Sequence, residues 1–292
     1  MTVARDIVWR DGRFCSAEAA ALSIRDRGVL IGDGAFETMI AINGAPAFWR
    51  EHLARLNAGL DVLRIPSFAA EPFPSIVARL HQENQIVNER TVIRVTVTRG
   101  VGARGLAGIN VVGSPTRLVE ISAAPPSARA PARLMVTTRQ RNTLSAFSRF
   151  KALSGYGENQ LARFDAEAAG FDDGLLVNER GAVACASVAN VFFFLEGDVL
   201  ATPSADEGAL PGVVRARVLS IAAKIGVCVA ERSVSPDEIR GRWAMLANSV
   251  LGVAPASVGP FPQSPAPALI ARIGALYDAE ERRSAEQGRN GR

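Results

Sequence analysis

The sequence predicts an α/β protein of the α+β type with two domains. Patterns typical of strands and of helices alternate along the chain, and a proline-rich segment interrupts them. That segment contains Pro125, Pro126 and Pro131 and has no periodicity, as expected of an extended linker. With 292 residues, 48% of them apolar, the chain suits one large domain or two of ordinary size, and the break favours two. We therefore expect an N-terminal α/β domain over 1–122, a linker over 123–133 and a C-terminal α/β domain over 134–292.

In the first domain, turn dipeptides and periodicity indicate the elements. Asp11-Gly12 and Asn43-Gly44 are dipeptides that favour tight hairpin turns. Apolar residues at helical spacing predict a helix over 50–63. A second helix is expected over about 75–83, and strands over 91–98, where apolar and polar residues alternate, and over 117–122.

In the second domain, strand and helix patterns alternate again. Ser235 is followed by Pro236 and two acidic residues, which predicts the capped start of a short helix. About the last fifteen residues are polar and charged, as expected of a fraying helix end. We further expect a helix over about 158–169 and another that follows Leu210-Pro211-Gly212 and runs to about 225. Strands are expected near 173–178, 182–187, 190–195 and 227–230.

Composition excludes several classes of function. The formal net charge of +4 is small and its basic residues are scattered, so no nucleic-acid partner is expected. No apolar run is long enough to span a membrane, so we expect a cytoplasmic protein without a membrane partner. The three cysteines, Cys15, Cys185 and Cys228, are too far apart in sequence for a disulfide framework or a metal motif. The two histidines, His52 and His81, leave little scope for histidine chemistry, and His52 is expected near the surface of its helix.

Two glycine motifs could bind phosphate groups, and they differ in the structure expected directly after them. Gly100–Gly105 has the spacing G-x-G-x-x-G after a strand, but no helix pattern opens within it, which indicates a flexible loop. Gly212 lies at the predicted start of a helix, where free N–H groups and the helix dipole favour an anion. Taken alone, the second motif is equally compatible with an ordinary loop-to-helix junction.

The basic residues point to one unusual lysine. Of the 33 lysines and arginines, only Lys151 and Lys224 are lysine. A lysine amine can lose its proton and attack a carbonyl group, whereas an arginine stays protonated. Lys151 directly follows the apolar Phe150. It precedes Tyr156, one of two tyrosines in the chain, by five residues. Lys224 lies in the last turn of a predicted helix and has an ordinary structural interpretation.

Seven segments, taken in order, resemble the motifs of one enzyme family. The first reads DRGVLIGDGAFET, the second has the pattern E-H-x-x-R-L, and the third and fourth contain Arg99 and Lys151. The series resembles the class IV (fold type IV) pyridoxal-phosphate enzymes, which include branched-chain and D-amino acid aminotransferases and 4-amino-4-deoxychorismate lyases. The resemblance implies a fold type IV enzyme with pyridoxal 5'-phosphate between its two domains, a homodimer, and no metal. The segments are 26–38, 51–56, 97–100, 151–156, 190–192, 210–215 and 248–249.

The resemblance also implies roles for individual residues. Lys151 would form the Schiff base with the cofactor, and its released amine would move the proton at the substrate α-carbon. Tyr156 would hydrogen-bond the phenolic oxygen of the cofactor. Two residues depart from the family pattern. Ile31 replaces a tyrosine that lines the substrate pocket in many members, and Val214 replaces a threonine that is common at the phosphate. The implied phosphate ligands are Arg55, the N–H groups of Val213 and Val214, and Ser249, and the implied substrate contacts are Arg99, Ile31 and Thr38.

Cys185 is the main departure from the family pattern, which places a glutamate here against the pyridine nitrogen of the cofactor. A neutral thiol cannot balance a pyridinium charge, so we hypothesise that this nitrogen is largely unprotonated. The alternative is that Cys185 is a small buried hydrophobic residue and another acid acts instead. The nearest acid in sequence, Glu179, is expected to be exposed in a turn.

Three functions remain open at this stage. The first is transfer of an amino group between an amino acid or amine and a 2-oxo acid. The second is elimination of the aminodeoxychorismate lyase type, which releases pyruvate and which the stretch around Asn248 resembles. The spacings from Lys151 to Tyr156 and to Cys185 resemble the branched-chain aminotransferases instead. The third, from another class, is a catalytically weak protein that binds pyridoxal phosphate.

Overall fold

The computed structural model describes residues 6–106, 113–125 and 130–290, which form two compact units. Unit 1 comprises Met1–Pro125, Phe150–Ser154 and Glu281–Arg292, and unit 2 comprises Pro126–Arg149 and Gly155–Glu280. Two segments that we expected with the C-terminal domain, 150–154 and 281–292, thus group with unit 1. The middle of the predicted linker, 126–129, lies outside the described residues, as do 1–5, 107–112 and 291–292.

Unit 1 is built on an antiparallel sheet in the order β2-β1-β6-β5-β3-β4. Asp11 and Gly12 both have positive φ, as do Asn43 and Gly44, so each pair forms the predicted tight hairpin turn. The strands expected at 91–98 and 117–122 are confirmed. The strands are β1 (Ile7–Arg10), β2 (Arg13–Ser16), β3 (Gly34–Ile42), β4 (Ala45–Pro46), β5 (Arg90–Thr98) and β6 (Thr116–Ala123).

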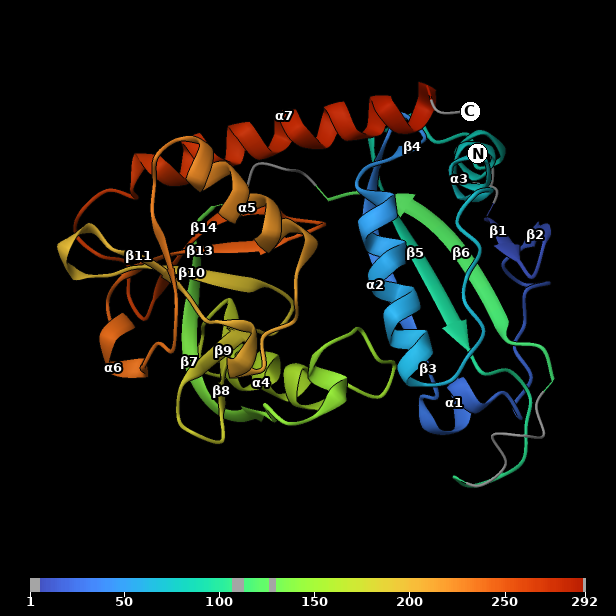
Figure 1. Cartoon of the computed structure of the whole chain (residues 1–292), viewed down its shortest axis with the longest axis horizontal. Helices are drawn as coiled ribbons and strands as arrows, with labels where there is room; N and C mark the ends of the chain where they lie inside the picture. Colours follow the sequence, from blue (N-terminus) through green and yellow to red (C-terminus); the bar gives the residue numbers. More distant parts are fainter. Residues whose placement is uncertain (1–5, 107–112, 126–129, 291–292) are drawn as a thin grey trace. The chain divides into compact units, whose positions relative to one another are not determined.

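Helices α2 (Trp49–Val62) and α3 (Phe73–Glu83) pack on this sheet and bury its core, and the short helix α1 (Arg27–Ile31) precedes β3. Figure 1 shows α2 lying along the strands β3 and β5. Leu53, Leu56 and Leu60 of α2 share the core with Met39 of β3 and Ile93 of β5. The helical spacing of apolar residues that predicted α2 therefore corresponds to the face of α2 that is buried on the sheet.

The segment 150–154 extends the edge of β3 at its beginning. The Phe36 N–H donates to the Lys151 carbonyl over 2.9 Å, and the Leu153 N–H donates to the Gly34 carbonyl over 3.0 Å. At Gly34 a Cβ atom would lie 2.3 Å from the carbonyl oxygen of Val97, so this close approach requires glycine. These backbone bonds explain why the segment groups with unit 1 although its sequence neighbours belong to unit 2.

Unit 2 is built on a mixed sheet in the order β12-β11-β10-β13-β14-β7-β8-β9. Its helices are α4 (Gly157–Ala168), which packs on β7 and β8, α5 (Val213–Lys224), α6 (Pro236–Ile239) and α7 (Ala268–Asn290). Helix α7 begins in unit 2 and ends in unit 1. The strands are β7 (Ala132–Arg141), β8 (Asp173–Asn178), β9 (Val183–Ala186), β10 (Asn190–Phe194), β11 (Leu200–Thr202), β12 (Val229–Glu231), β13 (Trp243–Asn248) and β14 (Gly252–Val258).

The predicted elements of unit 2 are confirmed to within two residues at most ends, and several unpredicted ones join them. Ser235 caps α6, and Glu238 completes a capping box with it. Strand β14 contains Pro255, which weakens its strand pattern in sequence. Neither β14 nor β7 was predicted, and of α7 only the C-terminal end was expected.

Candidate active site

In unit 1, Glu37 of β3 is the centre of a buried network. One of its carboxylate oxygens, Oε2, accepts from Nδ1 of His52 over 2.8 Å and from Nη2 of Arg55 over 2.9 Å. The other, Oε1, accepts from Nε of Arg55 over 2.6 Å. His52 and Arg55 are three residues apart in α2 and therefore lie on one face of the helix. Glu37 thus fixes the side chains of His52 and of Arg55, the predicted phosphate ligand.

Burial and pairing set the charges in this network. Burial raises the pKa of Glu37, but Arg55 and His52 outweigh that effect and bring the pKa to about 2. Burial lowers the pKa of His52, so its ring is neutral near neutral pH and donates its Nδ1 proton to the Glu37 anion. The expectation that His52 lies near the surface is wrong, because its side chain is 2% exposed and bonds to Glu37 on a strand distant in sequence.

Lys151 lies beside this network. Its Nζ atom is 5.1 Å from the centre of the Phe36 ring, and the Arg94 guanidinium lies 4.0 Å from the same ring. The charge of Lys151 also contributes to lowering the pKa of His52. Thr38, expected at the substrate, is paired with Arg94 across β3 and β5. The structure therefore brings Lys151, Arg55 and Thr38 together, and adds Arg94, which the sequence analysis missed.

Lys224 differs from Lys151, as expected. It ends α5, its side chain is 63% exposed, and its amine donates to Glu280 over 2.8 Å. This is an ordinary surface ion pair at a helix end.

Arg99 and Ile31 lie elsewhere in unit 1. The Arg99 guanidinium donates to both carboxylate oxygens of Asp33, over 2.7 and 3.1 Å, and to the carbonyls of Leu63 and Arg64. Burial raises the pKa of Asp33, but the hydrogen bonds and charges of Arg99 and Arg27 outweigh it and lower the pKa. Four hydrogen bonds leave Arg99 little capacity to hold a substrate. Ile31 ends α1 with a side chain 40% exposed.

In unit 2, the segment 187–190, which is the loop after β9 together with the first residue of β10, connects the predicted cofactor residues. Its carbonyl groups accept hydrogen bonds from Asn159 over 2.7 Å and from Asn248 over 3.1 Å. Asn159 lies in the first turn of α4, just after Tyr156 at the N-cap, and Asn248 directly precedes Ser249. The loop therefore fixes the segments that carry Tyr156 and Ser249.

The same loop also fixes the beginning of α5. Nδ2 of Asn190 donates to the Leu210 carbonyl over 2.9 Å. At Gly212, a Cβ atom would lie 2.0 Å from Oδ1 of Asn190, so only glycine fits. The N-cap residue of α5 is Gly212, which has no side chain to cap the helix, and the N–H groups of Val213 and Val214 lie in the first turn. A helix start without a side-chain cap, approached by a glycine, is a favourable place for a phosphate group.

Cys185 lies in β9 opposite Leu176 of β8 and packs with Ala162 and Ala184. Burial raises the pKa of its thiol to about 11, so the thiol is neutral. Glu179 is exposed and hydrogen-bonded to Thr143, as expected of a turn residue. The carboxylate that also raises the pKa of Cys185 is that of Asp173, which is buried.

The residues of the two units fit pyridoxal 5'-phosphate in their chemistry. They offer an amine for its aldehyde, an arginine and a helix start for its phosphate, and a tyrosine hydroxyl for its phenolic oxygen. Among the described residues, no group of histidine, cysteine, aspartate or glutamate side chains could hold a metal ion. Within the same part of the chain, no helix is long and apolar enough to cross a membrane.

Comparison with known proteins identifies the class of protein that this fold and site define. Residues 34–258 match the family "Amino-transferase class IV". The chain therefore belongs to the class IV aminotransferase family, and its architecture of two sheets with helices is the fold type IV of branched-chain aminotransferases.

Its relatives include proteins of two activities. The chain is 29% identical over 235 residues to the "Putative branched-chain-amino-acid aminotransferase" of Methanocaldococcus jannaschii, covering 80% of each chain. It is 28% identical over 257 residues to an aminodeoxychorismate lyase of Bacillus subtilis, covering 85% of each. In fold it matches the crystal structure of the branched-chain aminotransferase of Thermoproteus uzoniensis with norvaline. That match has a TM-score of 0.84 and 23% identity, and covers 93% of each chain.

Proposed function

We propose that this protein is a pyridoxal-phosphate-dependent aminotransferase that moves an amino group between an amino acid or amine and a 2-oxo acid. The observation that carries the proposal is the position of Lys151. One of only two lysines in the chain lies beside Phe36 and the Glu37–His52–Arg55 network, in a member of the class IV family. A lysine amine can bond to an aldehyde, which a guanidinium cannot do under the same conditions.

When bound, the cofactor supplies an electron-withdrawing ring that stabilises negative charge at the substrate α-carbon. Lys151 would bond to its aldehyde and, once released, take and return the proton at that carbon. Glu37 would orient the Arg55 guanidinium toward the phosphate, which Ser249 and the N–H groups of Val213 and Val214 would also bind. Tyr156 would donate to the phenolic oxygen.

Arg94 is our candidate for holding the carboxylate of the substrate, in place of Arg99. Arg94 and Lys151 both contact the Phe36 ring, so a carboxylate on the guanidinium would place its α-carbon near the amine. Arg99 would act through Asp33 to fix the segment before β3. Replacing Arg94 by glutamine should raise KM for the amino donor, whereas replacing Arg99 should reduce thermal stability.

Borohydride reduction followed by peptide mapping tests the role of Lys151. Borohydride makes the bond between cofactor and lysine permanent, so the labelled peptide should contain Lys151. Lys151→Ala should lose the label and the visible absorbance of the cofactor, and Lys224→Ala is the matched control that should keep both. A label on Lys224, or no label on either lysine, would remove the enzyme interpretation.

We propose further that the ring nitrogen of the cofactor is largely unprotonated opposite Cys185. The support is the neutral, buried thiol. Replacing Cys185 by glutamate should raise the rate at which an amino acid converts the bound cofactor to its amine form, followed by absorbance. The same rate and spectrum in Cys185→Glu would refute this part. The alternative is that the buried Asp173, whose charge acts on Cys185, pairs with the ring nitrogen. In that case Asp173→Asn should slow the conversion of the bound cofactor to its amine form.

Elimination of the aminodeoxychorismate lyase type is the second candidate, favoured by the 28% identity to the Bacillus subtilis lyase. A panel of amino donors and 2-oxo acids, with pyruvate release from aminodeoxychorismate included, separates the two reactions. A labelled Lys151 without turnover of any substrate would favour a protein that binds the cofactor but is catalytically weak. A homodimer is part of the proposal, and sedimentation of the purified protein would measure it.

A further inference from the structure

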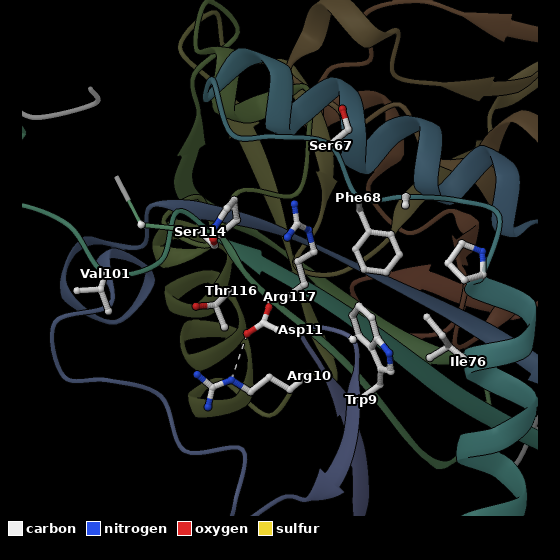
Figure 2. A pocket seen from close by; sticks show the side chains of 15 residues that line it. Trp9, Arg10, Asp11, Ser67, Phe68, Ile76, Val101, Ser114, Thr116 and Arg117 are labelled. Atoms are coloured by element: carbon white, nitrogen blue, oxygen red, sulfur yellow. Dashed lines mark hydrogen bonds and ion pairs between the residues drawn. The ribbon is translucent and has the colours of Figure 1, made fainter. Parts of the chain in front are cut away.

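A pocket of about 680 Å³ opens in unit 1, and none of the residues assigned above to cofactor or substrate lines it. It lies where the hairpin of β1 and β2 meets the start of β6 and the segment that leads into α3 (Figure 2). Its volume is in the range of small-molecule sites, about 300–1,000 Å³.

One side of the pocket is aromatic and fixed. Trp9 and Phe68 meet edge to face, with their ring centres 5.9 Å apart. Asn57 of α2 accepts from the Phe68 N–H over 2.9 Å and donates to the Phe68 carbonyl over 3.1 Å. Phe68 is 2% exposed and Ile76, which continues this side, is 5% exposed. The aromatic side is therefore formed before any ligand binds.

The polar side of the pocket has one cation more than its anions. Arg10 donates to Asp11 over 3.3 Å and to the carbonyl of Ala21 over 2.6 Å, so its charge is paired. Asp11 also accepts from the backbone N–H of Arg117 over 2.8 Å. The Thr116 hydroxyl donates to the buried Asp26. These groups are occupied by contacts within the protein.

The guanidinium of Arg117 is the exception. Among the described residues, no acidic side chain or carbonyl group accepts a hydrogen bond from it. In Figure 2 its side chain points away from the Arg10–Asp11 pair and toward the side of the pocket where Phe68 lies. A guanidinium beside an aromatic wall suits a carboxylate that is attached to a ring, since the charge and the flat body are satisfied together.

We propose that this pocket binds an aromatic monocarboxylate, with the carboxylate on Arg117 and the ring against Trp9, which the buried Phe68 supports. Of the described charged groups that line the pocket, Arg117 alone lacks a partner, so one negative charge neutralises it and a second would be left unpaired. The site is independent of the proposed aminotransferase activity.

Titration of the full chain with 3-phenylpropionate, followed by calorimetry and by tryptophan fluorescence, tests the proposal. We expect saturable binding that Arg117→Gln weakens at least tenfold. The neutral analogue 3-phenylpropionamide should bind at least tenfold more weakly than the acid to the wild type, and equally to both proteins. Arg13→Gln is the matched control, an exposed arginine of β2 that does not line the pocket, and it should leave binding unchanged.

Several results would overturn the proposal: no saturable binding, equal affinity in wild type and Arg117→Gln, or an amide that binds as tightly as the acid. If the carboxylate bound at the candidate active site instead, Arg94→Gln would weaken its binding and Arg117→Gln would not. Lys151→Ala should retain the binding at the pocket. A failure here therefore differs from a failure of the aminotransferase proposal, which the Lys151 label tests separately.

Discussion

The residues predicted to bind cofactor and substrate differ in kind between the two units. In unit 1 an ion pair between Glu37 and Arg55 is buried within the protein, and the neutral ring of His52 completes the network. In unit 2 they are neutral, with backbone N–H groups at the start of α5 and a thiol at Cys185. We infer that the stability of unit 1 depends on pH and on the charges of its buried network. Cofactor binding by unit 2 depends instead on the shape of its backbone.

The largest effect expected from this comparison is on Glu37. Glu37→Gln removes the anion and leaves Arg55 buried without its charge partner, which typically costs about 3–5 kcal/mol. Thermal or denaturant unfolding measures the loss. Glu83→Gln, which breaks an exposed pair with Arg79 in α3, is the matched control and should change stability little. Equal losses in the two variants would contradict the special position of Glu37.

The next effect is the response to acid. The pKa of Glu37 in the folded protein is about 2, below the usual 4.5, so its stabilisation is present above pH 4.5 and is lost as pH falls toward 2. A difference of this size corresponds to about 3 kcal/mol. The lowered pKa of His52 acts in the same direction, because acid favours the unfolded state once the pH falls below the usual 6.5. Unfolding in denaturant across this range should show a flatter acid limb for Glu37→Gln.

In unit 2 the expected effect concerns shape at Gly212. Gly212→Ala would place a Cβ atom 2.0 Å from Asn190 Oδ1 and displace the start of α5. We expect the affinity for pyridoxal phosphate to fall at least tenfold, about 1.4 kcal/mol, as measured by absorbance titration. Gly274→Ala in α7, where a Cβ atom meets only ordinary contacts, is the control. Unchanged affinity in Gly212→Ala would indicate that the phosphate binds elsewhere.

The smallest effect is expected for Cys185→Ala. If the thiol acts as a small apolar group in the packing of β9, its removal should cost about 1 kcal/mol and leave the acid limb unchanged. Cys228→Ala, at an exposed position, should change nothing measurable. A new pH dependence in Cys185→Ala would show that this part of unit 2 carries charge after all.

Local features of the sequence predicted most of the elements. Asp11-Gly12 and Asn43-Gly44 mark hairpin turns because both residues of each pair adopt positive φ. Strand β3 escaped prediction for a physical reason, since eight of its nine residues are buried and the alternation of a one-sided strand is absent. Helix α1 has only five residues, too few to show a period.

Contiguous motifs singled out candidate site residues, whereas contacts between distant residues could not be predicted. The motif order singled out Lys151 and Gly212, whose roles stay predictions, and it misplaced His52 because the partner of His52, Glu37, lies on another element. Arg99 had a family role in the sequence, whereas the structure bonds it to Asp33, 66 residues away. The spacing of His52 and Arg55 on one helix face, together with a glutamate inside the first family-like motif, was the signal available for the network.

The assignment of 150–154 to unit 1 bears on how this chain can be divided or engineered. The segment that carries Lys151 groups with unit 1, while the residues on both sides of it group with unit 2. The last part of α7 groups with unit 1 again. A single cut in the linker would therefore yield an N-terminal fragment without Lys151 and a C-terminal fragment whose lysine segment has lost β3. Complementation by two separately expressed fragments would require both pieces to assemble during folding, so the pairing of the Lys151 segment with β3 depends on the continuity of the whole chain.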